Sequence, residues 1–363
     1  MVREMTTTPT SMNGGDGENS YTRNSASQGV AFELVKSLIS EGIATKLDLV
    51  RLISPSSPKI LRIADLGCSV GPNTFTSVQE ITNYLKLKCR QRDHDVEFQV
   101  FFNDQFSNDF NTLFKNLPSD RQYFAAGVPG SFHDRLFPEN FLHFMHCSYS
   151  LHWLSSAPKE LVDQDSPAYN KGRIYYAAAP TAVVQAYSNQ FAKDITSFLN
   201  ARSHEVVPGG LMTLVIPGVP DGVPHSQCGF VATHALIEAC LIDIHHQGLI
   251  SEAKIDSFNM PIYIPAAPEI KALIEKNGCF SIEKMESIIY GEEVVKLLYI
   301  DEQMVSSQLR AVWEGIISEH FGNDIVDELF DQFAKRFAEA FMGSKPRNNG
   351  RTVLIFALLK RNL

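Results

Sequence analysis

The residues best suited to chemistry lie in the stretch ADLGCSVGPNT, at positions 64–74. Asp65 ends a run of apolar residues and is followed at once by a turn that contains Gly67 and Gly71. Because glycine has no Cβ, the backbone of this turn can approach a bound molecule closely. Asp104 ends a second apolar run. Ligands of open α/β sheets bind at the carboxyl ends of the strands, so both acids are candidates for one site.

The spacing of the glycines indicates which ligand the turn accepts. Gly67 and Gly71 form G-x-x-x-G, whereas dinucleotide-binding turns carry G-x-G-x-x-G, and no P-loop lysine follows. Asp65 would repel a pyrophosphate but attract a cation. S-adenosylmethionine carries an ammonium and a sulfonium group, and its ribose hydroxyls can donate to Asp104. The turn therefore favours S-adenosylmethionine over NAD. The alternative is a tight turn that merely exposes an acid.

The same five residues, Gly67-Cys68-Ser69-Val70-Gly71, also match G-x-S-x-G, the nucleophile elbow of α/β-hydrolases. Such an elbow lies deep in a sheet whose earlier strands precede it in the chain. Here only a helix and one clear strand precede Ser69, and no HGGG-type oxyanion segment is visible. The hydrolase interpretation is therefore disfavoured.

Apolar periodicity predicts the elements that position these residues. Strands are expected at 59–65, 96–102, 122–127, 142–150 and 211–216, and helices at 27–52, 109–117 and 179–204. Strands that alternate with helices predict an α/β fold with a parallel, doubly wound sheet. The region from 218 to 345 is mostly helical by pattern (229–247, 266–277, 301–319, 323–342), and 351–360 returns as a strand that could close the sheet.

Composition excludes several classes of protein. With 32 Lys and Arg against 41 Asp and Glu, the net charge is -9, which disfavours binding to nucleic acid or to an anionic membrane. No apolar run approaches the roughly 18 residues of a membrane helix. The first 24 residues are polar, lack the apolar core of a secretory signal and read as a mobile arm. Six cysteines without C-x-x-C spacing fit a reducing compartment, so a soluble cytoplasmic protein is expected.

Four further segments point to one family. They are GENSYTRNSASQ (17–28), NDFNTLF (108–114), GVPGSFHDRLFP (127–138) and SYSLHWLS (148–155). Together with DLGCSVGPNT they resemble the plant SABATH methyltransferases, which transfer a methyl group from S-adenosylmethionine to small carboxylic acids or to xanthine nitrogens. The resemblance runs from about Met12 to the C-terminus.

The resemblance implies a class I methyltransferase fold, a Rossmann-like doubly wound sheet with a largely helical substrate-binding cap. Residues 1–25 would form an N-terminal arm that folds over the active site. Residues 26–217 and 346–363 would form the domain that binds S-adenosylmethionine, and 218–345 the cap. The resemblance thus changes the interpretation of the arm from a mobile tail to a lid. A homodimer is expected on the same basis.

The family's cofactor site maps onto nine positions of this chain. They are Tyr21 and Ser25 of the arm, Asp65, Cys68 and Asn73 of the turn, Asp104 and Gln105 after the second strand, and Ser131 and Phe132 of GVPGSF. Cys68 is expected to line the cofactor rather than to react. Some members also bind magnesium, at positions that match Asn170, Asp256, Phe258 and Asn259. Phe258 could contribute only its backbone carbonyl, and a structural carboxylate cap is the alternative.

The substrate contacts of the family map to Gln28 and Trp153, with Tyr149 and His152 lining the pocket. The Gln28 amide and the Trp153 indole can donate hydrogen bonds that orient a carboxylate. A carboxylic acid, with a pKa near 4, is already ionised at neutral pH, so no general acid or base is expected. His152 is interpreted as a wall residue or donor rather than a base, and Trp153 as a pocket residue rather than core. A metal site of His143, His146 and His152 is disfavoured, because residues three apart on a strand face opposite sides.

Three positions depart from the family pattern. Asn13 stands where members that act on aromatic acids commonly carry lysine, and His234 stands where they carry a tryptophan that clamps a flat ring. Gln105 replaces a leucine. The first two changes disfavour salicylate or benzoate and favour a less planar or more polar acid. Two alternatives stay open: an N-methyltransferase for a xanthine-like heterocycle, and a paralogue that binds both ligands without turnover.

Overall fold

A computed structural model of the 363-residue chain describes residues 11–52, 59–91, 96–290, 301–341 and 353–363. The first ten residues of the expected arm lie outside the described residues, and so does the expected domain boundary between 345 and 346. Within the described ranges, no helix is both long enough and apolar enough to cross a membrane.

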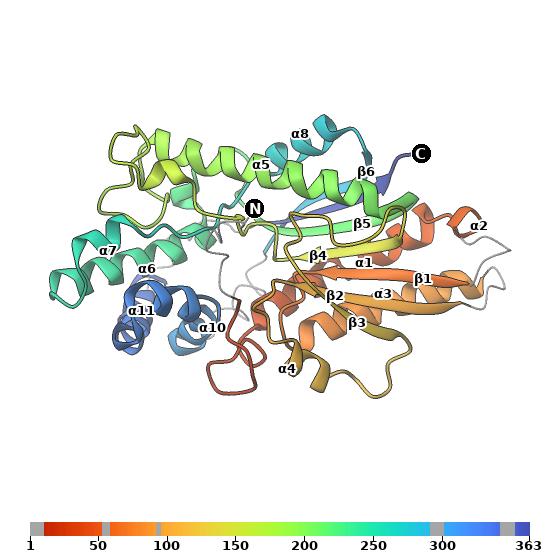
Figure 1. Ribbon diagram of the computed structural model, residues 1–363, viewed down its shortest axis with the longest axis horizontal. Helices are drawn as coiled ribbons and strands as arrows, with labels where there is room; N and C mark the ends of the chain where they lie inside the picture. Colours follow the sequence, from red (N-terminus) through yellow and green to blue (C-terminus); the bar gives the residue numbers. More distant parts are fainter. Residues whose placement is uncertain (1–10, 53–58, 92–95, 291–300, 342–352) are drawn as a thin grey trace, which may run out of the picture.

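Seven strands form one sheet in the order β3-β2-β1-β4-β5-β7-β6 (Figure 1). They are β1 (Ile60–Leu66), β2 (Glu97–Asp104), β3 (Phe124–Pro129), β4 (Leu142–Ser148), β5 (Val206–Gly218), β6 (Phe280–Ile289) and β7 (Val353–Arg361). The first five pair in parallel, as predicted from the alternation of strands and helices. The doubly wound sheet is confirmed, and 351–360 closes it as β7, which runs antiparallel to both β5 and β6 and makes the sheet mixed.

Strand β6 was not predicted and falls inside the segment expected to be mostly helical. Its sequence, FSIEKMESII, places polar and charged residues among the apolar ones, and most of its side chains are only half buried. This pattern suits an edge strand, where one face and one row of backbone groups meet solvent. The pairing with β7, which is distant in sequence, therefore defines the strand.

Helices cover both faces of the sheet. On one face α1 (Ala26–Lys46) and α3 (Pro72–Arg90) share a core with β1 and β2, and on the other α5 (Thr181–Glu205) packs against the sheet. Helix α8 (Ala267–Asn277) packs beside α5 and β6. The short helices are α2 (Leu49–Leu52) and α4 (Phe110–Lys115), and three single 3₁₀ turns lie at Lys159–Leu161, His225–Gln227 and Asn323–Ile325.

The cap lies beyond the carboxyl ends of the parallel strands (Figure 1). It consists of α6 (Gly229–His246), α7 (Glu252–Asp256), α10 (Glu302–Phe321) and α11 (Val326–Phe341). Helix α11 presents one apolar stripe to α6 and α10, including Leu329, Phe333 and Phe337, which explains why its periodicity was readable from sequence.

Residues 11–25 connect the cap to the sheet. The backbone N–H of Asn13 donates to the carbonyl of Ala311 on α10 at 2.9 Å. The Ser11 hydroxyl donates to the carbonyl of Ser107, after β2, at 2.8 Å. The polar composition of this segment thus supplies hydrogen bonds to two distant parts of the chain.

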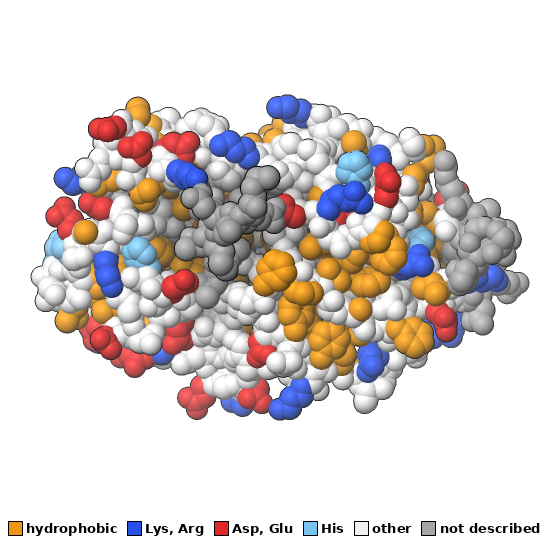
Figure 2. All heavy atoms as spheres, viewed as in Figure 1, with side chains coloured by type: hydrophobic (Ala, Val, Ile, Leu, Met, Phe, Trp, Pro, Cys, Tyr) orange, Lys and Arg blue, Asp and Glu red, His pale blue; other side chains and the backbone are white. Residues whose placement is uncertain are grey.

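The connection between β3 and β4 adds no helix to the layers that cover the sheet. The connection between β3 and β4, residues 130–141, contains neither helix nor strand. Figure 2 shows hydrophobic side chains gathered over this part of the surface, and Phe106 and Phe124 are 77% and 61% exposed. Because this segment forms no element of its own, contacts with other parts of the chain must fix its position.

Candidate active site

The turn after β1 depends on its glycines. The N–H groups of Gly67 and Cys68 both donate to the carbonyl of Asn103 at 2.9 Å, which draws the turn against the end of β2. Gly67 has φ +79°, and a Cβ there would lie 2.1 Å from the Ser150 hydroxyl oxygen. Another residue at this position would therefore displace the turn.

The two acids are held beside this turn. Asp104 accepts from the N–H of Ser69 and from its neighbour Gln105, each at 2.7 Å, and Asp65 accepts from the hydroxyl of Thr74. Burial raises the pKa of Asp65 to about 7 and that of Asp104 to about 6. Proximity of Asp104 contributes to the shift of the Asp65 pKa. No cationic group among the described residues pairs with either carboxylate, so the two acids suit a positively charged ligand.

A cavity adjoins the turn and is lined by Tyr21, Asp65, Cys68 and Asn73 of the expected cofactor set. Asn73 also binds Ser25, since its amide donates to the Ser25 carbonyl at 2.7 Å and to the Ser25 hydroxyl at 2.9 Å.

The other four expected cofactor residues, Asp104, Gln105, Ser131 and Phe132, do not line this cavity but lie along the neighbouring strand ends. The N–H of Gly130, just before Ser131, donates to the Asp104 carbonyl at 2.9 Å. The Phe132 ring lies against the glycine turn, 3.6 Å from the position of a Cβ on Gly67.

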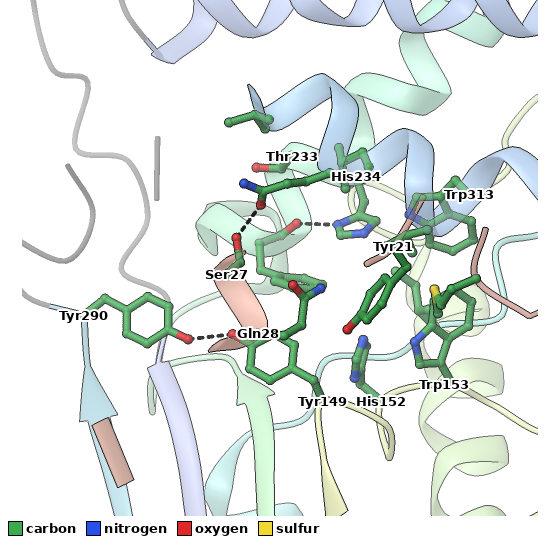
Figure 3. A pocket seen from close by; sticks show the side chains of 17 residues that line it. Tyr21, Ser27, Gln28, Tyr149, His152, Trp153, Thr233, His234, Tyr290 and Trp313 are labelled. Carbon is green, nitrogen blue, oxygen red and sulfur yellow. Dashed lines mark hydrogen bonds between the residues drawn. The ribbon is translucent and has the colours of Figure 1, made fainter. Parts of the chain in front are cut away.

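A second pocket, with about 860 Å³ of empty space including its mouth, lies between the sheet and the cap (Figure 3). Its lining contains all five expected substrate residues, which are Gln28, Tyr149, His152, Trp153 and His234. Tyr149 is one of three non-glycine residues with positive φ in the described ranges, at 54°, and its hydroxyl lies 2.5 Å from that of Tyr290.

Tyr21 and Gln28 line both the cavity at the turn and the second pocket. In Figure 3 both side chains point into the second pocket, together with His152. The Oε1 atom of Gln28 is buried and has no hydrogen-bond partner among the described residues. The two pockets therefore meet at these two side chains, where a group could pass from one ligand to the other.

The pocket histidines are neutral at physiological pH. Burial lowers the pKa of His152 to about 3, with a contribution from nearby His234, and lowers that of His234 to about 4. Nδ1 of His234 lies 2.8 Å from the carbonyl of Phe230, so the ring donates there and Nε2 is left as an acceptor. Neither ring is a ready source of positive charge, as expected for a site that needs no acid catalyst.

Apart from His234 on α6, sequence reasoning missed the residues that the cap supplies to the pocket. Trp313 on α10 packs on Trp153, with ring centroids 4.9 Å apart, and Gln308 accepts from the Ser27 hydroxyl at 2.5 Å. Phe230 stacks on His234 at 4.6 Å. These residues carry no local motif, although Trp313 could have been noticed as the second of only two tryptophans.

The residues expected to hold magnesium form a hydrogen-bonded cluster. The Asn170 amide donates to Oδ1 of Asn259 at 2.7 Å. Asp256, the single charged member, accepts from the Gly172 N–H at 2.7 Å and from the Tyr169 hydroxyl at 3.1 Å, so both of its oxygens are engaged. Oδ1 of Asn170 is buried without a hydrogen-bond partner among the described residues, so it is an oxygen that a cation could use, while Asp256 already binds the protein. The magnesium site stays a prediction of the family resemblance.

Two other sequence interpretations find no geometric support. Across the part of the chain that the structure describes, no three His, Cys, Asp or Glu side chains are placed to hold a metal ion. His143 accepts from the Arg62 N–H at 3.0 Å, while His146 pairs with the Thr213 hydroxyl at 2.8 Å. The Ser69 hydroxyl is buried without a hydrogen-bond partner among the described residues, so no histidine there activates it as a nucleophile.

Comparison with known proteins agrees with this geometry. Residues 7–362 match the family described as SAM dependent carboxyl methyltransferase. Loganic acid O-methyltransferase of Catharanthus roseus is 46% identical over 333 residues, covering 91% of this chain and 88% of the relative. A 3,7-dimethylxanthine N-methyltransferase of Camellia sinensis var. assamica is 40% identical over 338 residues, covering 89% of each protein.

A solved structure of loganic acid methyltransferase with SAH has a TM-score of 0.91 and 43% identity, covering 97% of this chain and 99% of that one. The family match spans nearly the whole chain, and the fold and the motifs agree with it. The chain therefore belongs to the SAM-dependent carboxyl methyltransferases, the SABATH family, and is an S-adenosylmethionine-dependent methyltransferase.

Proposed function

We propose that this enzyme methylates the carboxylate of a small, non-planar acid that carries hydroxyl groups, giving a methyl ester and S-adenosylhomocysteine. S-adenosylmethionine would bind at the glycine turn, and the acid would bind in the pocket under the cap. The observation that carries the proposal is that Tyr21 and Gln28 line both pockets. The methyl group and its acceptor can therefore meet beside these side chains.

The reaction needs orientation rather than proton transfer. A carboxylate oxygen forms a bond to the methyl carbon, the sulfur–methyl bond breaks, and its electron pair returns to sulfur. No proton moves, which agrees with the neutral state of His152. Gln28 and Trp153 would hold the carboxylate so that oxygen and methyl carbon lie at roughly 3–3.5 Å, in line with the departing sulfur. Positive and negative charge cancel in the step, so a pocket that excludes water favours it.

The polar atoms of the pocket support the proposed substrate class. Nε2 of Gln308 and Nε1 of Trp313 are buried donors without a partner among the described residues. An unpartnered buried polar group costs about 1–3 kcal/mol, so a ligand hydroxyl that binds it is favoured over a purely apolar ring. Nε2 of His234 adds an acceptor. Loganic acid, the substrate named for a relative, is a carboxylic acid, and a related alicyclic acid is the substrate class we propose.

A xanthine-like heterocycle is the second candidate, because a relative of 40% identity is named as a xanthine N-methyltransferase. A flat bicyclic ring would gain little from the histidine at position 234, which replaces the tryptophan clamp. Gln28 and Trp153 together also suit an anion better than a neutral ring nitrogen. A silent binder is the third candidate, and it is disfavoured because Asp65, Asp104, Gln28 and Trp153 are all present in the sequence.

The methyl transfer proposed here needs no metal ion, because the acid is already ionised and no proton moves, and the magnesium site stays a prediction of the family resemblance. A homodimer and a cytoplasmic location stay predictions of the family resemblance. Neither is needed for the chemistry proposed here.

The test is transfer of label from methyl-labelled S-adenosylmethionine to a panel of free acids, each paired with its amide, together with xanthines. The panel should include aromatic, indolic, terpenoid, jasmonate-like and gibberellin-like acids, and alicyclic acids with and without hydroxyl groups. We expect extractable label from a hydroxylated alicyclic acid and none from its amide. Label in xanthine alone would support the second candidate. Tight cofactor binding without any turnover would support the silent binder.

A further inference from the structure

A buried ion pair lies at the C-terminal end of α5, away from both pockets. Nε of Arg202 and Oε2 of Glu205 are 2.7 Å apart, and both side chains are 0% exposed. Moving two charges out of water costs several kcal/mol per ion unless further hydrogen bonds compensate. The groups that hydrogen-bond to Arg202 and Glu205 offset this cost, and they identify the segment that the ion pair holds in place.

Both side chains bind the backbone of the segment that follows β3. Arg202 donates from Nη1 to the Phe132 carbonyl at 2.7 Å and from Nη2 to the Asp134 carbonyl at 2.8 Å. Oε1 of Glu205 accepts from the N–H groups of Leu136 and Phe137 at 2.5 and 3.0 Å. Two carbonyls and two N–H groups of residues 132–137 are therefore satisfied by one ion pair.

This segment needs such partners because it forms no regular structure. Residues 130–141 contain neither helix nor strand, so their backbone groups cannot bond within an element. The planar guanidinium donates in several fixed directions, so Arg202 can reach two carbonyls and Glu205 at once, which a lysine ammonium cannot do in the same way. Phe198, also on α5, lies edge-on to Phe132 at 6.3 Å and lies 5.1 Å from the Arg202 guanidinium.

The same segment begins beside the glycine turn that follows β1. The Asn103 amide donates to the Gly130 carbonyl at 2.9 Å, and Gly130 donates to the carbonyl of Asp104. The Phe132 ring then lies against Gly67. The segment is thus fixed at one end by the tip of β2 and at the other by the ion pair, with Ser131 and Phe132 between them.

We propose that Arg202 and Glu205 are positioning residues for methyl-donor binding, which hold residues 131–137 so that Ser131 and Phe132 face the donor. This inference rests on the proposed function, because it takes the donor to bind beside the glycine turn. Neither side chain lines either of the two pockets. Loss of the pair releases the wall formed by Ser131 and Phe132 and leaves the acid pocket under the cap in place.

The test uses the full-length enzyme with Arg202→Lys, which keeps the charge beside Glu205 but cannot span both carbonyls. A second variant, Arg202→Met with Glu205→Leu, removes both charges so that neither is left buried alone. Calorimetry would measure the dissociation constant of S-adenosylhomocysteine, and kinetics the KM of the acid. Ile274→Ala on α8, a buried site away from the glycine turn, serves as a control for a general loss of stability.

We expect Arg202→Lys to raise the dissociation constant of S-adenosylhomocysteine at least fivefold and the double variant to raise it at least tenfold. The KM of the acid at saturating donor should stay within twofold, and Ile274→Ala should leave both constants unchanged. Wild-type affinity in a folded Arg202→Lys enzyme would overturn the inference, as would equal rises in both constants. If the wild-type enzyme itself did not bind S-adenosylhomocysteine, the proposed function would fail instead.

Discussion

The indole of Trp153 lies against the indole of Trp313, with ring centroids 4.9 Å apart and planes inclined at 38°. Trp153 follows β4 of the sheet, while Trp313 lies on α10 of the cap. The backbone of Trp153 also forms an isolated bridge with Ile262, which leads into the cap side of the pocket. Sheet and cap therefore meet at this pair of rings, which forms the wall beside the proposed carboxylate site.

Trp153→Phe should separate acid binding from donor binding. The substitution keeps an apolar ring against Trp313 but removes the indole N–H that we assign to the carboxylate. A hydrogen bond to a charged group contributes about 1.5–3 kcal/mol, so kcat/KM for the acid should fall by about 10- to 150-fold. The dissociation constant of S-adenosylhomocysteine, measured by calorimetry, should stay within twofold. Equal losses of both would contradict the assigned role.

Asp104→Asn should have the opposite effect. One side-chain oxygen becomes an NH₂ group, so either Ser69 or Gln105 loses its acceptor, and the ribose of the donor loses a charged one. We expect the dissociation constant of S-adenosylhomocysteine to rise at least tenfold, with a smaller change in the KM of the acid. Asp120→Asn, which removes an exposed charge, is the matched control and should leave both constants unchanged. Donor affinity that survives Asp104→Asn would remove this residue from the site.

The pH dependence of donor binding tests the role of Asp65. Burial raises its pKa to about 7, so the carboxyl is largely protonated at pH 6 and ionised at pH 8. Only the ionised form attracts an ammonium group, and therefore affinity for S-adenosylhomocysteine should rise from pH 6 to pH 8 and then level off. Calorimetry across this range would show the change. Asp65→Asn should bind weakly and keep only a smaller rise below pH 7, which comes from Asp104 with its pKa of about 6. The full wild-type slope in that variant would assign the titration to a group other than Asp65.

Much of the cavity beside the glycine turn could be predicted from sequence because most of the residues that line it are close together in the chain. The turn from Asp65 to Asn73 follows directly from a buried strand, and the parallel pairing of β1 and β2 then brings Asp104 beside it. The acceptor pocket was only half predicted. Trp313 and Gln308 lie on α10. The apolar periodicity of this helix predicts that one of its faces is buried, but it does not predict that this face meets Trp153. Strand β6 was missed because its pairing partner, β7, lies far away in sequence.

His234→Trp should change the preference of the enzyme between acids. The imidazole stacks on Phe230 and meets Trp313 edge-on at 5.6 Å, in a wall of the acceptor pocket. An indole there would occupy more of the pocket and offer a flat surface, which suits a planar ring and hinders a puckered one. The ratio of kcat/KM for benzoate or salicylate to that for a hydroxylated alicyclic acid should rise about tenfold or more, in the range that small changes of pocket shape produce.

His234→Phe is the matched control, since it keeps a ring of similar size and removes both nitrogens. Because we assign Nε2 of His234 to a substrate hydroxyl, His234→Phe should lower kcat/KM for the hydroxylated acid and leave kcat/KM for benzoate or salicylate unchanged. An unchanged ratio in His234→Trp would mean that position 234 does not select the substrate.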